Sequence, residues 1–170
     1  MASSKPYRQL PTASRAQGLP AIGFELETEL PITPDVGAVR CSEQRADGRP
    51  IGELAVEVFA AALVIDRDGI LAAKASERAG GAPAVAVVLP GVSGYRADAI
   101  TDDPLRYVHV FAMAPDLGVD AGVLVTIRSA RPEWPAAESI LRSLRLLTRH
   151  GSVPVAANDE SAPLLPLVED

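Results

Sequence analysis

The fold of this chain is decided by residues 107–149, which read YVHVFAMAPDLGVDAGVLVTIRSARPEWPAAESILRSLRLLTR. Residues 107–114 are largely apolar on both faces of a two-residue alternation, and residues 123–128 repeat this alternation after a connection. Such a pattern indicates two neighbouring strands. Pro132 and Pro135 then open a segment with helical periodicity. The stretch therefore predicts a strand, a turn, a second strand and a helix.

The helix is expected to be amphipathic. Its apolar stripe joins residues at helical spacing, namely Trp134, Ala137, Leu141, Leu144 and Thr148. Cations gather toward its C-terminal end, where they stabilise the helix dipole: Arg142, Arg145, Arg149 and His150. Trp134 is the only tryptophan. We expect it to anchor the helix to the sheet, with a role as an interface anchor as the alternative.

An earlier strand is predicted between residues 22 and 30. Apolar residues alternate there with Glu25, Glu27 and Glu29, so one face would enter the core and the other would be solvated. Residues 38–45 are expected to be the antiparallel partner of this strand.

The middle of the chain is interpreted as strand, helix and strand. Residues 54–65 are rich in Val, Phe and Ile and favour a long strand, although their alanine content also permits a helix. Residues 70–78 suit a short helix, which Gly80 and Gly81 would end. The apolar run 84–89 is expected to be a strand that is buried on both faces.

A turn at 91–94 would lead to a further short strand at 95–100. These elements predict an α+β fold: a largely antiparallel sheet of about six or seven strands, with a C-terminal amphipathic helix packed on it and one shorter helix. The single domain is expected to span residues 21–150. Residues 1–20 would form a flexible N-terminal arm and residues 151–170 a flexible acidic C-terminal tail.

Composition narrows the classes of partner. The chain has 170 residues, a hydrophobic fraction of 48% and a net charge of −6. Nucleic acids and anionic membranes require concentrated Lys and Arg, so neither is an expected partner. The polar start of the chain lacks the apolar core of a secretory signal, and the longest apolar run, 58–65, is too short to span a bilayer. A cytoplasmic location follows by elimination, although a protein exported by a signal-independent route would have the same composition.

A calcium-loop pattern and a lone cysteine are both better explained by structural roles than by chemistry. Asp66, Asp68 and Glu77 occupy positions of a calcium-loop pattern, but Ile70 and Ala72 stand where oxygen ligands belong, so a turn is the better interpretation. Cys41 is the only cysteine and excludes an internal disulfide; we interpret it as a packing residue. No metal or cofactor is expected.

Ser93 and His109 supply the one candidate for nucleophilic catalysis. Ser93 follows an apolar strand, as a nucleophilic serine can, but its glycines do not have the spacing of the hydrolase motif. The pair would act only if the two side chains were within hydrogen-bond reach. We assign no catalytic residue, and keep a small hydrolase that uses this pair as an alternative.

The acidic tail contains a short apolar segment that could bind a partner or its own domain. Its apolar members are Leu164, Leu165, Leu167 and Val168. A frayed tail and a linear docking segment are both compatible with this composition.

The order of elements resembles the PsbP-like α/β/α sandwich superfamily. The resemblance rests on Gly23-Phe24-Glu25-Leu26 in a strand that ends at Pro31, on Gly94-Tyr95-Arg96, and on Ile140-Leu141-Arg142-Ser143-Leu144 in the last helix. It implies a central antiparallel sheet flanked by helices. It also implies a largely non-enzymatic role, since its members include extrinsic subunits of photosynthetic complexes, binders of small GTPases and chaperones for secreted effectors.

We therefore expect a non-enzymatic binding module. It would be an accessory, chaperone or adaptor protein that binds another protein through a sheet face or its acidic tail. The expected binding residues are Trp134 and the apolar residues of the tail. A structural subunit of a larger assembly is a further alternative to the hydrolase.

Overall fold

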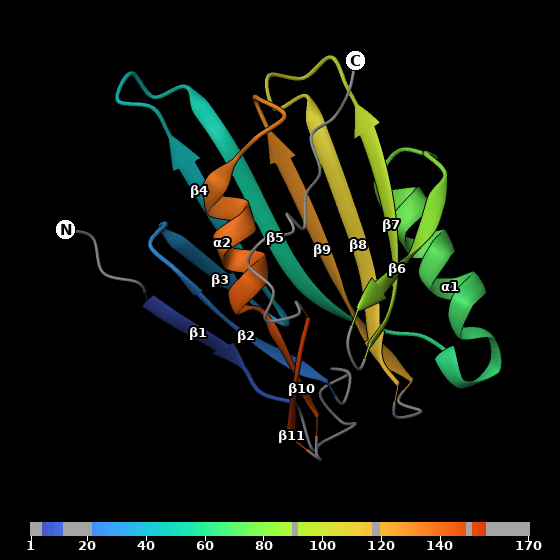
Figure 1. Ribbon diagram of the computed structural model, residues 1–170. Helices are drawn as coiled ribbons and strands as arrows, with labels where there is room; N and C mark the ends of the chain where they lie inside the picture. Colours follow the sequence, from blue (N-terminus) through green and yellow to red (C-terminus); the bar gives the residue numbers. More distant parts are fainter. Residues whose placement is uncertain (1–4, 12–21, 90–91, 117–119, 149–150, 156–170) are drawn as a thin grey trace.

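A computed structural model describes residues 5–11, 22–89, 92–116, 120–148 and 151–155. They form two antiparallel sheets and two helices (Figure 1). The larger sheet has seven strands in the order β3 (Ile32–Asp35), β4 (Ala38–Gln44), β5 (Pro50–Ala60), β9 (Ala121–Ser129), β8 (Tyr107–Pro115), β7 (Val92–Ile100) and β6 (Ala84–Leu89). The predicted α+β class with largely antiparallel pairing is confirmed.

A second sheet of four strands joins the two ends of the domain. Its order is β1 (Lys5–Gln9), β2 (Gly23–Thr28), β10 (Arg145–Thr148) and β11 (Gly151–Pro154). The prediction of a single sheet was wrong, because β2 pairs with β10 rather than with a strand of the larger sheet.

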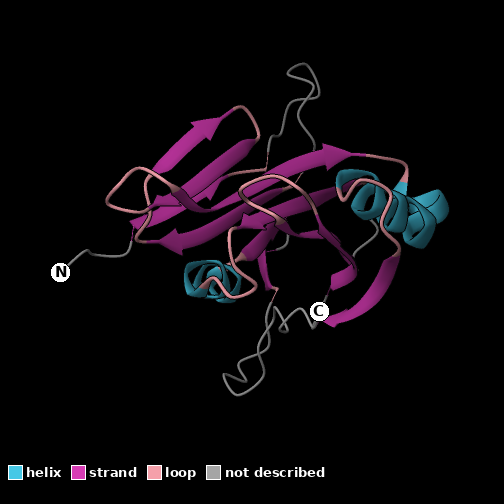
Figure 2. Cartoon of the chain, turned by 90° about the horizontal axis from the view of Figure 1, so that it is seen from above, coloured by secondary structure: helices cyan, strands magenta, loops and turns pink. Residues whose placement is uncertain are grey.

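The larger sheet carries a layer on each face. Helix α1 (Leu63–Arg78) lies against β7 and β8 on one face. Helix α2 (Pro135–Ser143) and the smaller sheet cover part of the other face, and Figure 2 shows the two helices well separated around the sheet. The main core lies between the two sheets and joins Phe24 and Leu146 to Val56 and Val125. Burial of these apolar side chains is the main source of stability.

The central strands are the part of the fold that the sequence predicted best. Both β8 and β9 have the expected bounds to within a few residues, and nearly all of their side chains are buried. They are apolar on both faces because one face packs under α1 and the other faces the smaller sheet and α2.

The predicted strand at residues 54–65 was wrong in its second half. Strand β5 ends at Ala60, and α1 begins at Leu63 instead of at Ile70. Asp66 has non-helical dihedral angles, so α1 is kinked at the position where the sequence suggested a turn. The Asp66 Oδ1 atom accepts a hydrogen bond from the backbone N–H of Gly69 across this kink. The predicted end of the helix at Gly80 and Gly81 agrees with their positive φ angles of 73° and 96°.

The predicted C-terminal helix is shorter and is not the last element. Helix α2 ends at Ser143, whose hydroxyl donates to the Ile140 carbonyl oxygen. Residues that the helical stripe included then form β10, where Leu146 is fully buried opposite Phe24. Tertiary pairing with β2 therefore overrides the local helical periodicity.

Several edge assignments also differ from expectation. Lys5–Gln9, inside the predicted N-terminal arm, is a strand paired with β2, and the predicted tail contributes β11. Strand β4 pairs with β3 and β5, not with β2. Strand β7 begins at Val92, within the predicted turn. Strand β6 is an outer strand, with Val85 58% exposed, rather than one buried on both faces.

Neither described helix has the length and apolarity needed to cross a bilayer.

Cys41 is a packing residue in the core between the sheets, as expected. It is fully buried on β4, and its burial raises the pKa of the thiol to about 11, against a smaller lowering by a hydrogen bond with Thr28.

At pH 8 only about one Cys41 thiol in a thousand would be ionised, and the thiolate is the reactive form. We expect no alkylation of the folded protein by iodoacetamide at pH 8 and complete alkylation in denaturant, as measured by mass spectrometry. Rapid labelling of the folded chain would contradict this burial.

Candidate functional site

Trp134 anchors the beginning of α2 to the larger sheet. It is the residue that precedes the helix, only 5% of its surface is exposed, and it belongs to the main core. Its indole Nε1 donates a hydrogen bond of 2.7 Å to Oε1 of Glu43 on β4. Pro135 follows at the first helical position, where the missing N–H costs nothing. The anchoring role that the sequence predicted is confirmed.

Gly52 on β5 provides the space for the indole ring. A Cβ atom at this position would lie 2.5 Å from Cδ2 of Trp134 and 2.6 Å from two further ring atoms. These distances are far below van der Waals contact, so a side chain here would displace the ring.

We expect Gly52→Ala to lower the free energy of unfolding by about 1–3 kcal/mol, the usual cost of overpacking a core. Urea unfolding followed by circular dichroism would measure it. Gly94→Ala is the matched control, because its Cβ would meet only side-chain atoms, at 3.1 Å or more. Equal losses of stability for the two variants would show that the packing of the Trp134 ring does not require a glycine at position 52.

An open groove lies beside Trp134 at one end of the molecule. Its volume is about 860 Å³, and the β4–β5 turn, the β7–β8 connection and the segment before α2 form its walls. These three connections lie along the top of Figure 1. We call it the Trp134 groove; its apolar wall includes Trp134, Ile51 and Pro104, and its basic side chains are Arg45, Arg49 and Arg131.

The Trp134 groove is lined by three arginines and by two glutamates, Glu43 and Glu133, so it is less acidic than the chain as a whole. Arg45 and Arg49 are mostly exposed and share Asp47 through long ion pairs of 3.9 and 3.8 Å. Glu43 faces the groove, but one of its carboxylate oxygens accepts the Trp134 hydrogen bond. Arginine and tryptophan are both enriched at the centres of protein interfaces.

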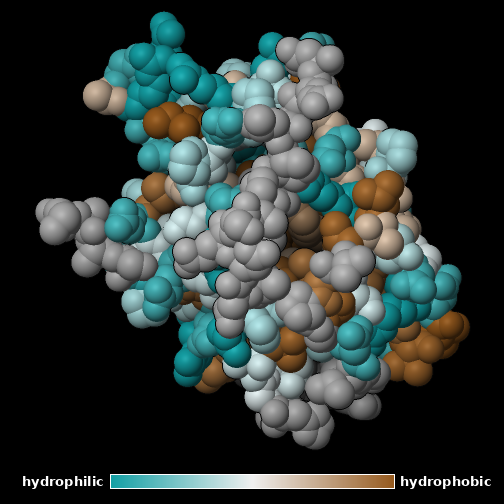
Figure 3. Space-filling model, in the orientation of Figure 1, coloured by the Kyte–Doolittle hydropathy of each residue, from teal (hydrophilic) through white to brown (hydrophobic). Residues whose placement is uncertain are grey.

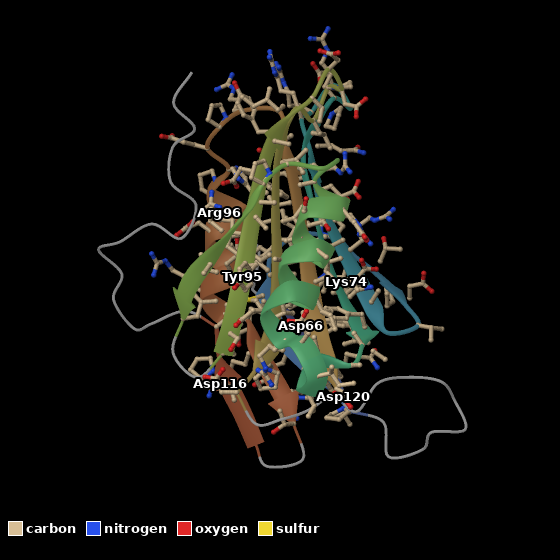
Figure 4. All side chains as sticks on the ribbon, turned by 90° about the vertical axis from the view of Figure 1, so that its right-hand side faces the viewer. Asp66, Lys74, Tyr95, Arg96, Asp116 and Asp120 are labelled. Atoms are coloured by element: carbon tan, nitrogen blue, oxygen red, sulfur yellow. The ribbon has the colours of Figure 1, made fainter. Side chains whose placement is uncertain are left out.

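A second polar cluster lies on the face of β7 and β8 that is opposite α1. Adjacent residues of β7 point to opposite faces, so Tyr95 lies on the α1 side and Arg96 on the other (Figure 4). Asp98 Oδ1 lies 2.6 Å from Nδ1 of His109 and 2.8 Å from Nε of Arg96. The cluster is held by cross-strand register, since Asp98 is opposite His109.

The carboxyl of Asp98 is shared between two basic side chains. Its partial burial acts to raise the pKa of Asp98, but hydrogen bonds from His109 and Arg96 and the attraction of the Arg96 charge outweigh this and lower it. Arg96 also stacks on the ring of Phe111, with 5.3 Å between its guanidinium carbon and the ring centroid. The buried Nε2 atom of His109 has no hydrogen-bond partner among the described residues. The cluster is therefore a compact ion pair set into the sheet.

Ser93 and His109 are not brought together. Ser93 lies opposite Ala114 and His109 opposite Asp98, so the two are five positions apart along the strand pair, or about 17 Å. The Ser93 hydroxyl instead donates to Oδ1 of Asp116 at 2.7 Å. The distance between them removes the geometry that a serine hydrolase requires.

The remaining candidates fall outside a common site. Leu164, Leu165, Leu167 and Val168 lie outside the described residues. Asp66, Asp68 and Glu77 belong to α1, and the described residues contain no group of His, Cys, Asp and Glu side chains that could hold a metal. Glu25 binds Arg8 of β1, while Glu27 and Glu29 are exposed, so the predicted solvated face is confirmed.

Glu43, Gly52 and the three groove arginines were missed from the sequence. Glu43, Gly52 and two of the arginines lie far from Trp134 along the chain, and the pairing of β5 with β4 and β9 brings them to it. Arg131 lies only three residues before Trp134, but the sequence does not show that the two line one groove. Asp98 was missed for the same reason, because its relation to His109 depends on strand register. Comparison of the chain with protein-family models, curated proteins and solved structures found no match.

Proposed function

We propose that this chain is a non-enzymatic binding module, an accessory, chaperone or adaptor protein that holds a segment of another protein in the Trp134 groove. The segment would be extended, acidic and partly apolar. One observation carries this proposal: a groove of about 860 Å³, lined by three arginines, two glutamates and the only tryptophan, lies on a chain whose net charge is −6. The three arginines in its wall favour a ligand with carboxylates over a basic one.

The apolar part of the groove supplies the second element of recognition. Trp134 is held in place by Glu43 and Gly52, so binding would not have to order this ring. A rigid aromatic side chain contributes contact area at little cost in conformational entropy. Ile51 and Pro104 also belong to the apolar wall. The groove thus suits a ligand that combines carboxylates with apolar side chains.

The polar clusters elsewhere support a binding role over a hydrolytic one. His109 and Arg96 are both engaged by Asp98, and the Ser93 hydroxyl is engaged by Asp116. We further infer a relationship to the PsbP-like superfamily, supported by an antiparallel sheet with helices on both of its faces. A cytoplasmic location remains part of this proposal.

Trp134 provides a direct assay, because it is the only tryptophan and lines the groove. The probe is a synthetic peptide of residues 158–170, which has four carboxylate side chains and the apolar residues Leu164, Leu165, Leu167 and Val168. We expect a saturable change in tryptophan fluorescence and a dissociation constant that rises with salt. Arg131→Gln should weaken binding about fivefold, the effect of losing roughly 1 kcal/mol.

Arg128→Gln is the matched control. It removes the same charge three residues earlier, but Arg128 lies opposite Glu53 on the other face of the sheet. Equal weakening by the two variants would indicate a general charge effect and contradict recognition in the groove. A wild-type chain that gives no saturable response would also contradict it.

A further inference from the structure

Three of the four outer strands of the two sheets carry features that block edge-to-edge pairing. Strand β1 contains Lys5, Pro6 and Arg8; β3 contains Pro34 and Asp35; β11 has four residues and ends at Pro154. Charges, prolines and short length are the usual means by which an exposed edge avoids pairing with another chain.

The outer strand β6 has none of these features. Its sequence, Ala84–Leu89, is AVAVVL, with no charge, proline or glycine. Within the described part of the chain it pairs with β7 alone, and Figure 1 shows it at the margin of the larger sheet. Val85 is 58% exposed. A six-residue apolar edge of this kind presents a row of unpaired backbone groups to another strand.

We propose that β6 pairs antiparallel with β6 of a second copy of this chain, about a two-fold axis perpendicular to the sheet. With the axis through Ala86, Val85 would lie opposite the partner copy's Val87. Pro83 and Pro90 bracket the strand and limit pairing to the same six residues in both copies. The edge therefore matches itself in length and in side-chain character.

Local charge does not oppose this pairing, although each chain is acidic. The residues of β6 are neutral, and the nearest charges on the same face of β7 are Arg96 and Asp98, which neutralise each other at 2.8 Å. A second copy thus brings no like charges directly opposite each other in the new strand pair.

The layer on the other face also leaves room for the partner. Helix α1 lies mainly over β7 and β8, with fewer contacts to β6, so the centre of the helix is about two strand spacings from the proposed axis. The two α1 helices would then be about 19 Å apart, beyond the 8–10 Å at which helices pack together. Neither helix would block the edge.

The proposed association closes at two copies. After β6 pairs with β6, the two remaining edges of the joined sheet are both β3, which carries Pro34 and Asp35. Neither edge can recruit a third copy in the same way. The arrangement predicts a dimer and excludes a growing fibre.

Light scattering after size-exclusion chromatography of the full chain tests the proposal. We expect a dimer at tens of micromolar, and at least a 100-fold higher dimer dissociation constant for Val85→Lys. The control is Ile65→Lys, because Ile65 is 87% exposed on α1 and even more accessible than Val85. Figure 3 shows an apolar patch over the beginning of α1, and Val64 and Ile65 are exposed apolar residues of that segment. A monomeric wild-type chain at 100 μM, or an unchanged Val85→Lys dimer, would overturn the proposal.

Cysteine cross-linking provides a second test that does not depend on the folding of Val85→Lys. Cys41 is the only native cysteine and is buried, so an added thiol reacts alone. Facing residues of an antiparallel pair have Cβ atoms about 4.5–5.5 Å apart, close to disulfide range. We expect a covalent dimer from Ala86→Cys under copper–phenanthroline and oxygen, with Val85→Cys and Val87→Cys testing a shifted axis. A cross-link at none of the three positions would exclude the pairing.

Discussion

Replacing Trp134 with alanine is expected to lower the free energy of unfolding by about 3–5 kcal/mol, the usual loss for a buried aromatic residue. The indole is 95% removed from solvent, packs over Gly52 and holds the beginning of α2 against β4 and β5. Its removal would leave a cavity and an uncoupled helix. Chemical unfolding followed by far-ultraviolet circular dichroism measures the change.

Two further variants separate the causes of this loss. Trp134→Phe keeps most of the apolar area but loses the 2.7 Å hydrogen bond to Glu43, so we expect a smaller loss of about 1–2 kcal/mol. Combining Gly52→Ala with Trp134→Ala should cost less than the sum of the single changes, because the added methyl enters the space that the ring has left. A loss below about 1 kcal/mol for Trp134→Ala would contradict its anchoring role.

Replacing Asp98 with alanine is expected to cost about 2–3 kcal/mol. The side chains of Arg96 and His109 are 8% and 2% exposed, and both lose this carboxylate as a partner. The estimate is below the usual cost of breaking a buried ion pair, because 43% of the Asp98 side chain is exposed and solvent screens part of the interaction. Urea unfolding at pH 7 measures the difference between wild type and Asp98→Ala. Asp98→Asn keeps a hydrogen-bond acceptor, so its free energy of unfolding should lie between those of the other two proteins.

The contribution of Asp98 should depend on pH in one direction. Folding lowers the pKa of its carboxyl below the ordinary value of 3.8. The stabilisation is therefore complete well above pH 3.8 and is lost as the pH falls through the lower pKa of the folded state. We expect a constant difference between wild type and Asp98→Ala from pH 7 to about pH 5, and a shrinking difference below pH 3.8. A difference that grows on acidification would contradict the assigned ion pair.

The elements that could be predicted from the sequence are the strands whose apolar pattern matches their burial. The strands β8 and β9 are apolar on both faces because both faces are covered, and β2 alternates because Glu25 is half-buried and Glu27 is exposed. In each case the local pattern and the tertiary environment agree, so the pattern alone was sufficient.

The secondary-structure predictions that were wrong concern segments where tertiary contacts override the local pattern. Val64 and Ile65 are exposed apolar residues at the beginning of α1, and they resemble the continuation of a strand. Thr148 fits the predicted helical stripe, but the segment Arg145–Thr148 forms β10 because β2 offers a strand partner. The apolar run of β6 suggested a central strand, although the sheet ends there. Local periodicity contains no information about which partner a segment will meet.

The candidate site shows the same division. Trp134 was recognisable because its residue type is rare and its place at the beginning of a helix is informative. Glu43, Gly52 and Asp98 are ordinary residues in strands and turns, and their roles depend on pairings across the sheet. The one catalytic pair that the sequence suggested fails because strand register separates Ser93 from His109.

The smaller sheet has a consequence for how the protein is made. Strand β2 finds its partner β10 only from the far end of the domain, and the backbone N–H of Glu27 binds the Ser143 hydroxyl from 116 positions away. A ribosome therefore releases β2 long before β10 exists, and one edge of β2 waits unpaired during synthesis. Closing a loop of this length is slow, since its entropy is lost before the contacts form. The fold is therefore completed only after the C-terminal strands have been translated. Until then, the unpaired edge of β2 must be protected from aggregation.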